Sequence, residues 1–122
     1  MRIIIDVVKK EECRNGDVAD YFYEGENLII KVATTGNKFY DRAIAIHELS
    51  ELSFLESKGV SLSVVDDFDK KCFEENKNEI SYGDQPDCPY KKEHRSAENI
   101  ERIFIQECGE DWLIYDDIVN NL

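Results

Sequence analysis

The chain has two histidines, and each stands four residues before a glutamate. His47 is paired in this way with Glu51, and His94 with Glu98. On a helix, positions four residues apart project from one face about one turn apart, so each pair sets an imidazole beside a carboxylate. Imidazole nitrogens and carboxylate oxygens are both zinc ligands, and two such helices packed together would direct them at one divalent cation. The spacing therefore predicts a metal site.

A catalytic zinc ion usually has three protein ligands and an open position for water, with a carboxylate nearby to take the proton of that water. We assign the ligand positions to His47, Glu51 and His94. Glu48 directly follows His47, as the general base follows the first histidine in the His-Glu-x-x-His helix of metalloproteases. Glu51 stands where that motif has its second histidine. It keeps a donor at the ligand position but adds negative charge, which should make the metal a weaker Lewis acid.

Two further carboxylates leave alternatives open. Glu98 could accept a hydrogen bond from a ligand imidazole or bind the metal itself, and Glu101 extends the same helical stripe. The pairs Glu48/Glu51 and Glu98/Glu101 are each three residues apart, as in di-iron carboxylate bundles or magnesium-dependent nucleotide pyrophosphohydrolases. A two-metal carboxylate site is therefore one alternative. Another is a non-catalytic protein in which both His/Glu pairs enclose a structural ion that joins two helices.

The first third of the chain has strand-like patterns. Residues 2–8, 20–24 and 27–34 are rich in β-branched, aromatic and other apolar side chains. Asn15-Gly16 marks a turn after the first of these segments, and Glu24-Gly25-Glu26-Asn27 marks a tight hairpin between the second and third. We expect a three-stranded antiparallel sheet at this end of the chain.

After the third strand the apolar spacing becomes helical. The first helix, capped by Asn37 or Asp41, carries His47 and Glu51 in its middle and ends near Gly59. Further helices are expected over residues 63–76, 89–108 and 111–119. A helix interior is rigid, so it suits metal ligands that must be held to a fraction of an ångström.

The third helix should carry His94, Glu98 and Glu101 beside its apolar face. Pro89 is expected at its first position, with Asp87 or Cys88 near the cap. The residues expected to face the core are Ala97, Ile100, Ile103, Phe104 and Cys108. The whole pattern predicts a single α+β domain over residues 1–122, a sheet followed by three to four helices.

Composition excludes several function classes. The chain has 27 acidic against 15 basic residues, a formal net charge of -12, which repels nucleic-acid backbones and anionic membranes. We find neither the roughly 20 consecutive apolar residues of a membrane span nor a signal-peptide pattern. Four scattered cysteines without a Cys-x-x-Cys pair argue against a zinc ribbon or a redox motif. We expect a cytoplasmic protein with reduced cysteines and with neither nucleic-acid nor membrane partners.

The residues also carry a resemblance. The stretches 45–55, 83–102 and 109–112 resemble a group of small uncharacterised phage and prophage proteins, and the similarity covers most of the chain. More distantly, three strands followed by a His-Glu-x-x-acid helix are similar to the minimal core of zincin metalloproteases. The resemblance implies a zincin-like metal-binding domain in the cytoplasm of a bacterial host. An aromatic edge strand at Tyr21 could pair with an extended peptide. The leading hypothesis is a zinc-dependent, peptidase-like hydrolase. In the non-catalytic alternative, the acidic surface would bind a phage or host protein partner.

Overall fold

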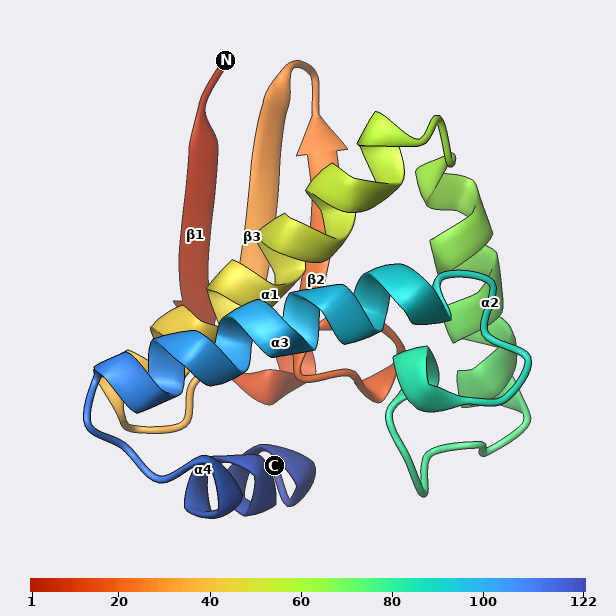
Figure 1. The fold of residues 1–122 in the computed structure, drawn as a ribbon. Helices are drawn as coiled ribbons and strands as arrows, with labels where there is room; N and C mark the ends of the chain where they lie inside the picture. The colour runs from red at the N-terminus through yellow and green to blue at the C-terminus, as the bar shows by residue number, and fades with distance from the viewer.

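A computed structural model describes all 122 residues (Figure 1). The prediction of an α+β fold is confirmed, since one three-stranded sheet precedes four α-helices. The strands are β1 (Ile3–Val8), β2 (Ala19–Glu24) and β3 (Asn27–Ala33). The helices are α1 (Lys38–Ser57), α2 (Leu62–Glu74), α3 (Lys91–Glu107) and α4 (Trp112–Asn120). Three 3-10 turns are η1 (Lys10–Glu12), η2 (Arg14–Gly16) and η3 (Tyr82–Asp84).

The sheet has the strand order β1-β3-β2. Strands β2 and β3 form the expected antiparallel hairpin, in which Glu24 pairs with Asn27 and Gly25 has a φ of +61°. Strand β1, however, runs parallel to β3, so the prediction of a purely antiparallel sheet is wrong. The reason is the path of residues 9–18, which carry the chain past β3 to the far edge and leave β3 between its neighbours.

Helix α1 covers β2 and β3 and begins where predicted (Figure 1). The side chain of Asn37 caps it by accepting a hydrogen bond from the N–H of Phe39 at 2.8 Å. Gly59, with a φ of +71°, ends it, and the N–H of Val60 donates to the carbonyl of Leu55 at 3.0 Å. The buried core joins the sheet to this helix. Its members include Leu28, Ile30, Val32, Ile44, Leu52 and Leu55.

Helix α3 crosses α1 and begins later than predicted. Its N-cap is Tyr90, so Pro89 is not the first helical residue. Pro89 instead lies in a turn that the N–H of Lys91 closes by donating to the carbonyl of Cys88 at 3.4 Å. The expected position of the cap at Asp87 or Cys88 is therefore wrong.

The buried face of α3 also differs from the expected one. Ala97 and Ile105 are fully buried, whereas Ile103 is 60 % exposed and Ile100 is 37 % exposed. The inward stripe contains Glu101 instead, which is buried. Glu101 can be buried on this face because His47 of α1 and Tyr115 of α4 form hydrogen bonds with its carboxylate.

The remaining helices complete the frame. The side chain of Asp111 caps α4 by accepting from the N–H of Ile114 at 3.0 Å, and α4 packs against α3. All four cysteines are free thiols, and three of them are buried. None of the helices combines the length and the apolar composition that a bilayer crossing requires.

Candidate metal centre

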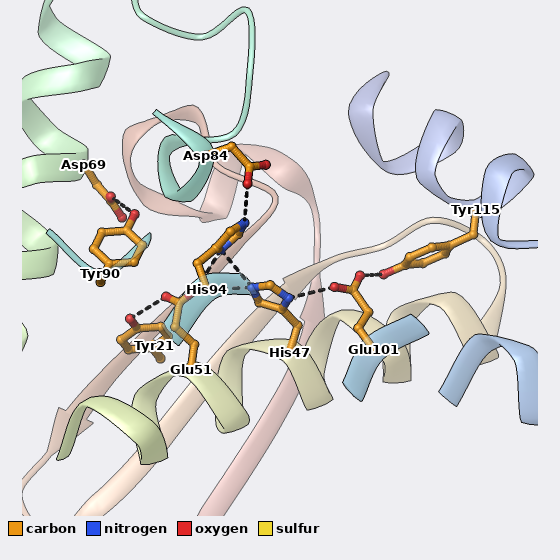
Figure 2. A network of polar contacts seen from close by, with 9 residues as sticks. All are labelled: Tyr21, His47, Glu51, Asp69, Asp84, Tyr90, His94, Glu101 and Tyr115. Carbon is orange, nitrogen blue, oxygen red and sulfur yellow. Dashed lines mark hydrogen bonds and ion pairs between the residues drawn. The ribbon is translucent and has the colours of Figure 1, made fainter. Parts of the chain in front are cut away.

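His47, Glu51 and His94 meet where α1 and α3 cross (Figure 2). Nε2 of His47 lies 3.1 Å from Nδ1 of His94. Oε2 of Glu51 lies 3.2 Å from the former atom and 2.9 Å from the latter. Zinc ligands at about 2.0 to 2.1 Å in tetrahedral geometry stand roughly 3.2 to 3.5 Å apart, close to the edges of this triangle. The three residues that the sequence predicts as ligands are therefore brought together in a geometry that could hold one ion.

Helix α1 places two of these residues on its core stripe. Ile44, His47, Glu51 and Leu55 follow one another at intervals of three or four residues, so they share one face. His47 is 7 % exposed and Glu51 is 4 % exposed. Burying such groups is costly unless each finds partners, so their contacts decide what the site can do.

The other ring nitrogen of His47 is held by a carboxylate. Nδ1 of His47 lies 2.7 Å from Oε1 of Glu101, which stands two turns after His94 on α3. The hydroxyl of Tyr115, on α4, donates to the second oxygen of Glu101. Because Glu101 accepts at Nδ1, that nitrogen carries the proton, and Nε2 of a neutral His47 presents its lone pair to the cluster.

His94 has a similar arrangement on its far side. Its Nε2 lies 3.7 Å from Oδ1 of Asp84 in η3. Gly83 lies directly against the ring, and a Cβ atom there would stand 2.2 Å from Cγ of His94, so only glycine fits. Glu51 is also fixed, because its Oε1 accepts from the hydroxyl of Tyr21 at 2.9 Å. Every member of the cluster is thus oriented by a neighbour outside it.

Nε2 of His47, Nδ1 of His94 and Oε2 of Glu51 face one another, so a proton or a metal ion must lie between them. Without a metal, protons must serve. Burial lowers the pKa of both histidines, but hydrogen bonds to Glu101 and Glu51 raise the pKa of His47 well above its ordinary value. Hydrogen bonds to Asp84 and Glu51 likewise raise the pKa of His94 to about 9. Burial opposes ionisation of Glu51, yet the two histidines lower its pKa to about 2. A divalent cation would replace these protons.

The cluster lines a cavity of about 630 Å³ that also contains Glu48. Glu48 is half-buried, and burial together with the charge of Glu51 raises its pKa well above the ordinary value. Burial also raises the pKa of Asp17 to about 6 and that of Asp69 to about 8. The cavity therefore offers carboxyl groups that can exchange protons near neutral pH.

Of the two additional carboxylates on α3, only Glu101 contacts a histidine. Glu98 lines the cavity, but no hydrogen bond or ion pair joins it to either ring. Burial and the charge of Asp84 raise the pKa of Glu98. Of the two residues, Glu101 is therefore the one that orients an imidazole of the cluster.

The sequence does not predict that four further residues contact the site. Tyr21, Gly83, Asp84 and Tyr115 come from three different elements and share no spacing with the histidines. The one available signal is the segment Gly83-Asp84, a glycine beside an acid in a loop that leads into the helix of His94. Such a glycine can mark a close approach of backbone to a functional side chain.

Comparisons with protein-family models, curated proteins and solved structures give no match. The chemical assignment of the site therefore depends on its own residues.

Proposed function

We propose that this chain is a zinc-dependent hydrolase with peptidase-like chemistry. His47, Glu51 and His94 would bind one zinc ion, and Glu48 would act as general base. The observation that carries the proposal is the convergence of three ligand atoms at 2.9 to 3.2 Å from one another. Orientation of each ligand by a partner outside the cluster is typical of metal centres, where such contacts fix the tautomer and direct the lone pair.

Three protein ligands suit a catalytic site. A zinc ion held in this way keeps a fourth position for water and lowers the pKa of that water to about 7. Glu48 lines the same cavity as the ligands and follows His47 on α1. Its raised pKa brings it closer to the working pH, so it could accept the proton of the water and later donate it to a leaving amine.

The surroundings favour an extended peptide as substrate. Pockets of about 300 to 1,000 Å³ enclose ligands of moderate size, and this cavity of about 630 Å³ lies within that range. Strand β2 is an edge of the sheet, and the side chain of its Tyr21 contacts Glu51. The outward carbonyl of Tyr21 accepts from Nη2 of Arg14 at 3.3 Å, so a peptide that pairs with β2 there would displace this contact. An extended peptide paired with an edge strand would run past the proposed zinc position.

A non-catalytic metal-binding protein is the second candidate. It is favoured by the contacts that join α1, α3, α4, β2 and η3 through the two rings and their carboxylates. An ion at the centre would link these elements and stabilise the fold. In that case Glu48 would have no role in the site.

A two-metal carboxylate site has less support. Both oxygens of Glu101 are engaged, one by His47 and the other by Tyr115. Glu98 forms no hydrogen bond or ion pair with His47, Glu51 or His94. Of the four glutamates in the two pairs, only Glu51 and Glu101 form a hydrogen bond with a histidine, which gives a site of bridging carboxylates less support.

The experiment that tests the proposal compares Glu48→Gln with the wild-type protein, each loaded with zinc, on a broad peptide library. General acid–base catalysis contributes about 10²- to 10⁴-fold to the rate of a reaction, so turnover should fall by about 10²-fold or more in Glu48→Gln. Zinc content and folding should stay unchanged. The matched control is Glu107→Gln, an exposed residue of α3, which should retain full activity. Hydrolysis that persists in Glu48→Gln would exclude the base assignment. A zinc-loaded wild-type protein without hydrolysis would favour the non-catalytic candidate.

A further inference from the structure

Strand β1 presents an apolar stripe at the free edge of the sheet. Ile3, Ile5 and Val7 are 49 %, 50 % and 51 % exposed. In the register with β3 they stand beside Leu28, Ile30 and Val32, so they lie on the sheet face that α1 packs against. Helix α1 covers β2 and β3, and nothing lies beyond β1 in Figure 1. A long apolar edge strand is a ready template for pairing with another strand.

The backbone N–H and C=O groups of successive β1 residues point alternately toward β3 and toward the open edge of the sheet. The carbonyls of Arg2 and Val8 accept from N–H groups of the β3 side, at 2.9 Å and 2.8 Å. In a parallel pair every second residue bonds to the neighbour, so the even-numbered residues of β1 use their polar groups in this way. The N–H and C=O groups of Ile3, Ile5 and Val7 therefore point outward.

We propose that the free edge of β1 binds β1 of a second copy of this chain. Two copies related by a two-fold axis would pair their edge strands antiparallel and join their sheets into one. Only residues with outward backbone groups can form the hydrogen-bonded pairs, which restricts the register to odd-numbered residues opposite odd-numbered ones. Placing Ile3 opposite Ile5 of the second copy satisfies this restriction.

The charges of Arg2 and Asp6 favour this register over registers shifted by two residues. With Ile3 opposite Ile5, Arg2 lies across from Asp6 of the second copy, and Ile4 lies across from its own counterpart. Arg2 and Asp6 are exposed, and neither forms an ion pair within the chain. A shift of two residues would place Asp6 opposite Ile4 instead. Opposite charges that face each other across a strand pair stabilise it, and like charges destabilise it.

This self-complementary pattern points to a second copy as the occupant. The segment Arg2-Ile3-Ile4-Ile5-Asp6 has a basic residue at one end, three isoleucines in the middle and an acidic residue at the other end. When two copies of it pair antiparallel, each basic residue therefore faces an acidic one. Each interface would contain the Arg2–Asp6 pair twice. An unrelated strand would need an acid and a base at matching positions.

The test measures association by sedimentation equilibrium over micromolar to millimolar concentrations. We expect a reversible dimer in the wild-type protein. Arg2→Asp and Asp6→Arg should each weaken it by about tenfold or more, because two cross-strand pairs become repulsive. The double variant R2D/D6R should restore association. Lys92→Asp and Glu107→Arg, exposed residues on α3, match the two charge changes and should leave association unchanged.

Two further measurements locate the interface. Amide hydrogen exchange at Ile3 and Ile5 should slow as the dimer forms. Ile5→Pro removes an outward N–H and the Ile5 side chain but no hydrogen bond to β3, so the chain should keep its wild-type circular dichroism spectrum but remain a monomer. A monomeric wild-type protein at millimolar concentration would overturn the proposal. So would a dimer with unprotected amides at Ile3 and Ile5, a dimeric and folded Ile5→Pro, or a double variant as weak as either single one.

Discussion

Nδ1 of His47 lies 2.7 Å from Oε1 of Glu101, so α3 provides both the opposing ring, His94, and the carboxylate that orients His47. The hydroxyl of Tyr115 holds the other oxygen of Glu101. One helix thereby sets the position of His94 and the tautomer of His47. A shift of α3 would disturb both imidazoles together.

Glu101→Gln should weaken zinc binding by about 10- to 100-fold, because loss of a carboxylate that orients a ligand histidine has that effect in metal sites. The measurement is zinc affinity by competition with a chromogenic chelator. Glu98→Gln is the matched control, since Glu98 stands one turn before Glu101 and forms no hydrogen bond or ion pair with either ring. Equal losses in the two variants, or a loss in Glu98→Gln alone, would disprove this role for Glu101.

Gly83→Ala should damage the site through His94. The new Cβ would stand 2.2 Å from Cγ of that ring, so η3 or α3 must move. Overpacking of this kind costs about 1 to 3 kcal/mol, and zinc affinity should fall with it. Ser81→Ala, at an exposed position just before η3, controls for the added alanine. Urea denaturation and zinc titration of both variants check the prediction, which fails if Gly83→Ala behaves like Ser81→Ala.

The metal-free protein should lose stability as the pH rises. The pKa of His94 is raised from an ordinary value of about 6.5 to about 9, so the folded state holds that proton more tightly. This stabilisation is complete below about pH 6.5 and disappears as the pH rises through about 9, at up to about 1.4 kcal/mol per pH unit. Urea denaturation in the presence of a chelator measures it. His94→Gln should show a shallower slope, and an identical slope would contradict the assignment.

Zinc should stabilise the wild-type protein but not His94→Ala. Free zinc at about 100 times its dissociation constant adds about 2.7 kcal/mol, which raises the Tm of a domain of this size by about 10 °C. The measurement is thermal unfolding with zinc and with excess chelator. A zinc-dependent rise of equal size in His94→Ala would exclude His94 as a ligand.

The α1 half of the site can be predicted from the sequence because a regular helix determines it. Four-residue spacing places His47 and Glu51 on one face, and the apolar residues Ile44 and Leu55 continue that face into the core. The participation of His94 follows from the absence of any other histidine. The hairpin of β2 and β3 is equally local, since its turn residues specify it.

The remaining contacts depend on tertiary packing. Tyr21 and Asp84 reach the cluster from a strand and a loop that no spacing rule connects to the histidines. The path of residues 9–18 makes β1 parallel to β3, and the turn signal at Asn15-Gly16 does not specify the direction of that path. On α3 the apolar-face rule fails, because partners from α1 and α4 satisfy Glu101 and Ile103 is left exposed.

Metal analysis of protein purified without an affinity tag tests the central claim most directly. Inductively coupled plasma mass spectrometry should find about one zinc ion per chain, as expected for a site with three protein ligands. The variant His47→Ala, purified in the same way, should contain almost none, whereas Glu107→Gln should match the wild-type protein. Wild-type protein without metal, or equal zinc in His47→Ala, would contradict the metal centre proposed at His47, Glu51 and His94.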